Sequence, residues 1–150
     1  MYEFVDRPVD EQIPSVRLTV WAIRQWTRAA LDGRCVCRLI GCAFASASVP
    51  DAADPLVATM RILVANLRAP VRLGAVDAHR IAEHEAVLLG ALVAAAQGRG
   101  REQDCRAVAS LLVHADMVPA LTIALIRLAQ AFARADMHLV PAGPGPACKE

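Results

Sequence analysis

The sequence predicts an all-α protein, a compact single-domain bundle of about six helices. The first observation is compositional: aromatic residues make up only 4% of a chain that is 56% apolar and rich in alanine. Alanine has the highest helix propensity and loses no side-chain entropy in a helix. The second observation is that apolar residues recur at helical spacing, without strand–helix alternation or a repeat of fixed period. The length of 150 residues suits one domain with its own core.

Turn and capping signals divide the chain into the expected helices. The expected ranges are 16–31, 34–45, 56–68, 77–97, 102–115 and 119–135. Ser15, Asp54 and Asp77 are predicted N-caps, because their side-chain oxygens can accept from the free N–H groups of a first turn. Gly33 and Gly98 stand where a residue with positive φ commonly ends a helix.

Apolar stripes assign the side of each helix that faces the core. The clearest stripes are Val16, Val20 and Ile23 in the first helix, Ile81, Leu88, Leu89 and Leu92 in the fourth, and Leu121, Leu125, Leu128 and Phe132 in the last.

Two segments lie outside the predicted bundle of residues 15–140. Residues 1–14 are expected to form an extended arm, because Pro8 and Pro14 disfavour a helix, and the aromatic residues of this arm could dock on the bundle. Residues 141–150 are rich in Pro and Gly and are expected to be disordered.

Charge and hydropathy exclude several partner classes. A net charge of +1 gives no general attraction to nucleic acid or to anionic membranes. The apolar run near the chain's centre is far shorter than the ~20 residues of a membrane span, and the acidic start does not read as a signal peptide. The five cysteines then favour a reducing, cytoplasmic location with mostly free thiols.

Three stretches carry a family resemblance: VRLTVWAIRQW in the first helix, DPLVATMRILVANL in the third, and RIAEHE (80–85) running into LLGAL (88–92). Over residues 15–132 the chain resembles a family of small, uncharacterised all-helical bacterial proteins known as a domain of unknown function. The resemblance implies a helical fold and no assigned activity. In that family a cysteine cluster precedes the arginine that matches Arg80, whereas residues 74–79 here read GAVDAH, so no role for those cysteines carries over.

Glu85 is a carboxylate within an apolar stripe, where an unpaired charge is costly. A carboxylate in an apolar pocket can act as an acid or base because burial raises its pKa. The preferred interpretation is a structural ion pair with an arginine of a neighbouring helix, with Arg38, Arg61 and Arg106 as candidates. A slight rotation of the stripe that brings Glu85 to solvent is the third alternative.

His79 and Glu83 form an i, i+4 pair that could hold a metal ion if both lie on one helix. The zinc-protease motif that begins at His84 is absent, since residue 88 is leucine rather than histidine. A solvated first turn, with carboxylates near the positive end of the helix dipole, is the preferred interpretation.

Cys35, Cys37 and Cys42 form the densest cysteine cluster. On a helix over 34–45, Cys35 and Cys42 lie about 10 Å apart and Cys35 and Cys37 point in different directions, so no internal disulfide is expected. Cys35 is the best candidate for a reactive thiol, because it is expected near a helix N-terminus and beside arginines. The preferred interpretation is that these cysteines are small apolar core residues.

Arg17, Trp21, Arg24 and Arg28 are expected to form one exposed face of the first helix. Tryptophan and arginine are enriched at the energetic centres of protein interfaces. The alternatives are that the arm or another helix covers Trp21, or that the face binds nucleic acid, which the net charge does not favour.

Together these patterns favour a small cytoplasmic helical module that binds another protein or itself, as a homodimer, with no catalysis, cofactor or membrane. The alternative is a thiol- or metal-binding module that uses the Cys35, Cys37 and Cys42 cluster.

Overall fold

The all-α prediction is confirmed by the structure, a computed structural model that describes residues 3–98 and 100–140. The described residues form six α-helices and two short 3-10 helices, Pro50–Ala52 and Ala115–Met117. The α-helices are α1 (Pro14–Leu31), α2 (Cys37–Ser46), α3 (Ala53–Ala65), α4 (Glu83–Ala96), α5 (Glu102–Ala109) and α6 (Val118–Arg134). The predicted disorder of residues 141–150 lies outside the described residues.

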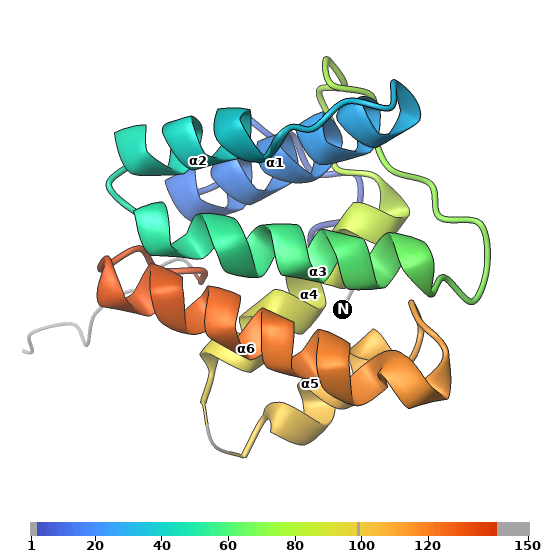
Figure 1. Cartoon of the computed structure of the whole chain (residues 1–150). Helices are drawn as coiled ribbons and strands as arrows, with labels where there is room; N and C mark the ends of the chain where they lie inside the picture. Colours follow the sequence, from blue (N-terminus) through green and yellow to red (C-terminus); the bar gives the residue numbers. More distant parts are fainter. Residues whose placement is uncertain (1–2, 99, 141–150) are drawn as a thin grey trace, which may run out of the picture.

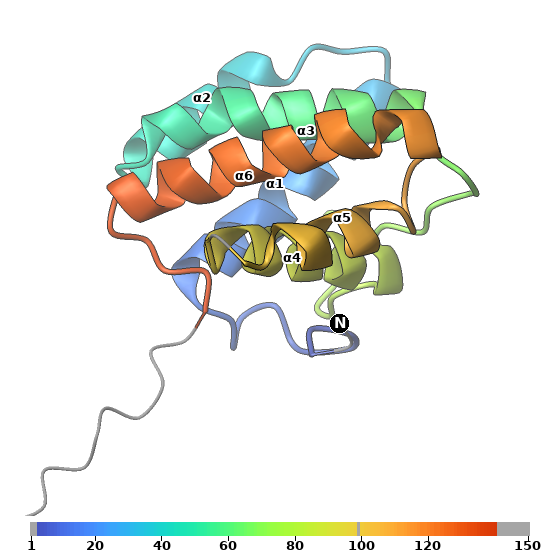
Figure 2. The same ribbon diagram turned by 90° about the horizontal axis from the view of Figure 1, so that it is seen from below.

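Helices α1 and α6 lie between the pair α2 and α3 on one side and the pair α4 and α5 on the other (Figure 2), and Figure 1 shows the same helices in a view turned by 90°. Helix α6 contacts α3 on one side and α4 and α5 on the other, while α1 contacts α2, α3 and α4. The predicted α6 stripe is confirmed, because Leu121, Leu125, Leu128 and Phe132 are all buried in the main core. By length and composition alone, Ala115–Arg134 could cross a membrane, but half of its most apolar window is buried in the bundle, as in an ordinary core helix.

The N-terminal arm docks on the bundle through a second, smaller core. Phe4 of the arm is buried with Val16 and Val20 of α1 and Leu89 of α4. Three backbone hydrogen bonds join the arm to the segment before α4: the N–H of Asp6 donates to the Ile81 carbonyl (3.1 Å), that of Ile81 to the Arg7 carbonyl (3.0 Å), and that of Val9 to the His79 carbonyl (2.9 Å).

Several expected helix ends differ from the observed ones because long-range backbone pairing takes precedence over local pattern. Helix α4 begins at Glu83 instead of residue 77, since the backbone of residues 79–81 pairs with the arm. Helix α5 ends at Ala109 instead of residue 115, because the next turn pairs with the end of α3, where the N–H of Arg68 donates to the Leu112 carbonyl (3.2 Å). Helix α2 begins three residues later than expected, at Cys37.

The predicted helix ends at glycine are confirmed, whereas the three predicted N-caps are wrong. Gly33 and Gly98 follow α1 and α4 with φ of +65° and +80°, as predicted. Ser15, Asp54 and Asp77 cap no helix: α1 begins one residue before Ser15, with Pro14 in its first turn, and the Ser15 hydroxyl donates to the His138 carbonyl instead. A proline in the first turn removes an N–H that has no helical partner anyway.

Candidate functional site

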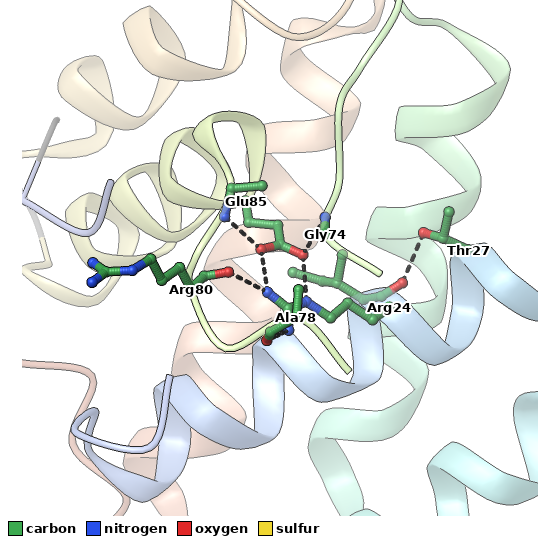
Figure 3. Close-up of polar contacts among 8 residues, drawn as sticks. Arg24, Thr27, Gly74, Ala78, Arg80 and Glu85 are labelled. Carbon is green, nitrogen blue, oxygen red and sulfur yellow. Dashed lines mark hydrogen bonds and ion pairs between the residues drawn. The ribbon is translucent and has the colours of Figure 1, made fainter. Parts of the chain in front are cut away.

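The most distinctive polar feature of the described residues is a buried ion pair between Arg24 of α1 and Glu85 of α4 (Figure 3). The Nε of Arg24 donates to Oε1 of Glu85 (2.8 Å) and its Nη2 donates to Oε2 (2.9 Å). The exposed fraction is 3% for Arg24 and 0% for Glu85. The burial expected of Glu85 is therefore observed, but its partner is none of the three arginines named above.

Glu85 occupies the third position of α4, where its carboxylate reaches the backbone ahead of the helix. Oε2 accepts from the N–H of Ala82, the residue that precedes the helix (2.8 Å), and Oε1 accepts from the N–H of Gly74 (2.9 Å). Negative charge is favourable at this end of a helix because the free N–H groups carry partial positive charge. With two bonds to each oxygen, the carboxylate has no acceptor site left for a substrate.

Arg24 uses its remaining donors on the loop between α3 and α4. Nη1 donates to the Ala78 carbonyl (2.6 Å) and Nη2 donates to the Arg80 carbonyl (2.8 Å). Only the carbonyl of Arg80 takes part, and its side chain extends away from the cluster (Figure 3). A Cβ on Gly74 would lie 2.7 Å from Nη2 of Arg24, so this close approach requires glycine.

This geometry assigns the Arg24–Glu85 pair a structural role. It joins α1, α4 and the loop of residues 66–82 through six hydrogen bonds, four of them to backbone groups of that loop. Within the described chain, every buried side-chain nitrogen and oxygen has a hydrogen-bond partner. Glu85 therefore lacks the free lone pair that acid–base catalysis requires.

The predicted interaction face is interrupted by the inward turn of Arg24. Arg17 and Arg28 are exposed, Trp21 is half-buried against the core, and Arg24 is buried, so the four residues do not form one exposed stripe. A sequence signal for this existed: Arg24 continues the i, i+4 row of the buried Val16 and Val20.

Trp21 lines a surface hollow of about 250 Å³. Three segments form its walls, the arm, α1 and the loop before α4, and the lining includes Val9, Asp10, Arg17, Trp21, Val76, Asp77 and His79. No local sequence pattern predicts this hollow, because the arm and the loop reach α1 only through tertiary contacts.

The helical pair expected from His79 and Glu83 does not form, because His79 lies in the extended segment before α4 and Glu83 is the first residue of that helix. His84 accepts at Nδ1 from the N–H of Arg72 (3.1 Å), which is a structural contact. Across residues 3–98 and 100–140, no group of three His, Cys, Asp or Glu side chains could hold a metal ion.

The cysteine cluster lies at the surface and not in the core, contrary to the preferred interpretation. Cys35 and Cys42 are exposed, Cys37 is half-buried, and all three are free thiols. Hydrogen bonds from the backbone N–H and the thiol of Cys37 lower the pKa of Cys35, and the same thiol contact, followed by burial, raises the pKa of Cys37. Burial raises the pKa of Cys105, which lies in the core, to about 11.

Comparison of the chain with models of protein families, with characterised proteins and with solved structures finds no match. The resemblance to a family of small helical bacterial proteins therefore stays a prediction.

Proposed function

We propose that this protein is a small helical interaction module without catalysis, which binds another protein or a second copy of itself through the hollow around Trp21. One observation carries the proposal: a half-buried tryptophan lines a hollow of about 250 Å³ that also contains an exposed arginine, Arg17, and an exposed valine, Val76. This proposal replaces the four-residue face, because Arg24 is engaged in the interior.

A tryptophan and an arginine in one hollow suit a protein partner, because these residue types often contribute most of the binding energy at protein interfaces. Tryptophan and arginine are the residues most enriched at interface positions whose truncation costs the most affinity. A partner side chain that fills the hollow would complete the burial of Trp21, and each Å² of apolar surface removed from water contributes about 25 cal/mol.

The charges around the hollow favour protein over nucleic acid. Asp10 and Asp77 line it together with Arg17, so its rim carries both signs. A phosphate backbone would meet these carboxylates and gain little from one arginine. The free thiols are consistent with the reducing cytoplasmic location that forms part of the proposal.

The test measures association of the full chain with Trp21→Ala and Arg17→Ala. We expect the wild type to form a dimer or a defined complex in native mass spectrometry of the reduced protein and of material cross-linked in cells. Either substitution should weaken that association while the helical circular dichroism signal stays unchanged.

Two matched control variants test whether the loss of association is specific to the hollow. Ile123→Ala removes an exposed apolar side chain of α6, and Arg134→Ala removes an exposed arginine of the same helix; neither residue lines the hollow. Both controls should associate as the wild type does. A monomeric wild type without a complex, or Trp21 and Arg17 variants that associate normally, contradicts the proposal.

A further inference from the structure

The hollow around Trp21 is bordered by a turn of the loop before α4, the yellow-green loop at the top of Figure 1. The N–H of Ala78 donates to the carbonyl of Ala75 (3.0 Å), so Val76 and Asp77 are the two central residues of this turn. Both residues are exposed, and both line the hollow. The tip of the turn therefore presents an apolar and an acidic side chain to solvent at the edge of the hollow.

The buried ion pair holds this turn at both of its ends. Nη1 of Arg24 donates to the Ala78 carbonyl (2.6 Å), and the carboxylate of Glu85 accepts from the N–H of Gly74, which directly precedes the turn (2.9 Å). A binding segment that is ordered before association loses less conformational entropy when it binds. The ion pair thus presents the tip of the turn in a fixed position beside the hollow.

Charged side chains of both signs line the hollow without a partner of their own. Arg17 of α1, Asp10 of the arm and Asp77 of the turn are exposed, and none of them forms a salt bridge within the described part of the chain. The other arginine of the lining, Arg24, is already engaged by Glu85. One small surface therefore offers both a cation and carboxylates to a binding partner.

The mixed charge of this surface disfavours a partner with a single sign of charge. An acidic segment would be attracted by Arg17 but repelled by Asp10 and Asp77, and a basic segment would meet the opposite conflict. The surface instead matches a partner that carries both signs, an apolar projection and an apolar hollow. In a two-fold symmetric dimer the same patch serves on both copies, so each contact from one residue to another occurs twice. A second copy of this surface has every feature that such a partner needs.

We propose that the partner is a second copy of this chain, bound as a two-fold symmetric dimer through the hollow and the turn of residues 75–78. This inference rests on the proposed function and names the partner that the hollow binds. Val76 of each copy fills the hollow of the other copy against Trp21. Asp77, the next residue of the turn, then pairs with Arg17, which lines the same hollow. Because both contacts form twice, one substitution removes two contacts from the dimer.

The test exchanges the two charges between copies of the reduced, full-length chain. Arg17→Asp and Asp77→Arg each place like charges opposite one another in their own dimers. We therefore expect the dissociation constant of either variant alone to rise at least about tenfold in sedimentation equilibrium. In an equimolar mixture, a dimer of one chain of each variant has opposite charges at both places. This mixed dimer should bind within several-fold of the wild type, and native mass spectrometry identifies it because the two variants differ in mass.

Matched variants outside the hollow control for exposure and charge. Val76→Ala should weaken the dimer, because it removes the side chain that fills the hollow, whereas Val64→Ala should not. Val64 is 44% exposed on α3, close to the 42% of Val76, and does not line the hollow. Arg127→Asp changes an exposed arginine of α6 outside the hollow and should dimerise as the wild type does. The helical circular dichroism signal should stay unchanged in every variant.

The outcomes separate this inference from the proposed function. If the purified wild type is monomeric while a complex with another protein in cross-linked cells depends on Trp21, the dimer is overturned and the proposed function stands. A dimer that persists in Arg17→Asp and Asp77→Arg, or that the mixture does not restore, also overturns the inference. If Trp21→Ala leaves every association intact as well, the hollow is not a binding site and both proposals fail.

Discussion

Arg24 and Glu85 are 61 residues apart in the chain and form a two-bond ion pair in the interior. Its contribution to stability does not come from the ion pair alone, because both side chains also bind backbone groups of the loop before α4. A buried pair can often be exchanged for apolar residues at little cost. Here that exchange would leave four partly buried backbone groups without these partners, so the pair is tied to the position of the loop.

Removing one partner of the pair should destabilise the fold strongly. Arg24→Ala or Glu85→Ala leaves an uncompensated buried charge, and we expect each to lower the free energy of unfolding by about 3–5 kcal/mol, measured by urea unfolding. Arg28→Ala is the control, since Arg28 is 66% exposed in its pair with Asp32 and should cost less than about 1 kcal/mol. Equal costs at positions 24 and 28 would contradict the structural role.

Replacing both partners by apolar residues tests the backbone contribution. Arg24→Met with Glu85→Leu removes both charges but leaves the Gly74 and Ala82 N–H groups and two carbonyls unpaired. We expect the double variant to stay about 1 kcal/mol or more less stable than the wild type, because an unsatisfied group costs about 1–3 kcal/mol when fully buried and less at these partly buried positions. Wild-type stability in the double variant would show that the backbone contacts contribute nothing.

Gly74 should not tolerate a side chain. The Cβ of Gly74→Ala would lie 2.7 Å from Nη2 of Arg24, which is held by its hydrogen bonds, so we expect a loss of about 1–3 kcal/mol. Gly41→Ala is the control: Gly41 lies within α2 with open space around its Cβ position, and alanine should stabilise the helix by up to about 1 kcal/mol. In an Arg24→Ala background the cost at position 74 should largely disappear, which chemical unfolding of the double variant would measure.

Cys105 should make the protein less stable at alkaline pH. Burial raises its pKa to about 11 from the usual 9.0, so the unfolded chain loses the thiol proton first. This contribution is complete below pH 9 and is lost as the pH rises through 11, with a maximum of about 2.7 kcal/mol at 1.36 kcal/mol per pKa unit. Cys105→Ala should lower stability at neutral pH yet flatten the decline between pH 9 and 11 in thermal unfolding. An unchanged decline would mean that other groups cause it.

The arm should protect the segment before α4 from solvent. Phe4→Ala removes the arm's buried side chain, and we expect a loss of about 3 kcal/mol if the site behaves as a core position. Hydrogen exchange should become faster at the amides of Ile81 and Val9, which donate to the Arg7 and His79 carbonyls between the arm and the segment before α4. The amides of α6 should change only by the loss of global stability. Unaltered exchange at Ile81 would show that the pairing does not depend on Phe4.

Much of the bundle could be predicted because helices depend on local pattern. The stripe Leu121, Leu125, Leu128 and Phe132 is buried as expected, and Gly33 and Gly98 end their helices. Glu85 was recognisable as an unusual buried carboxylate because it interrupts an apolar stripe of helical period. Each of these features depends on residues within a few turns of one another.

Only the tertiary structure decided the partner of Glu85, the true start of α4 and the inward turn of Arg24. Arg24 continues the i, i+4 row of Val16 and Val20, which favours the interior, but its long side chain could still extend to solvent. Its inward direction depends on the carboxylate brought to it from 61 residues away. Likewise, the backbone of residues 79–81 could have continued a helix until the arm supplied hydrogen bonds across the chain. Local sequence determined the helices and their apolar faces, because i, i+4 bonding and burial are short-range; the polar contacts between segments needed the folded arrangement.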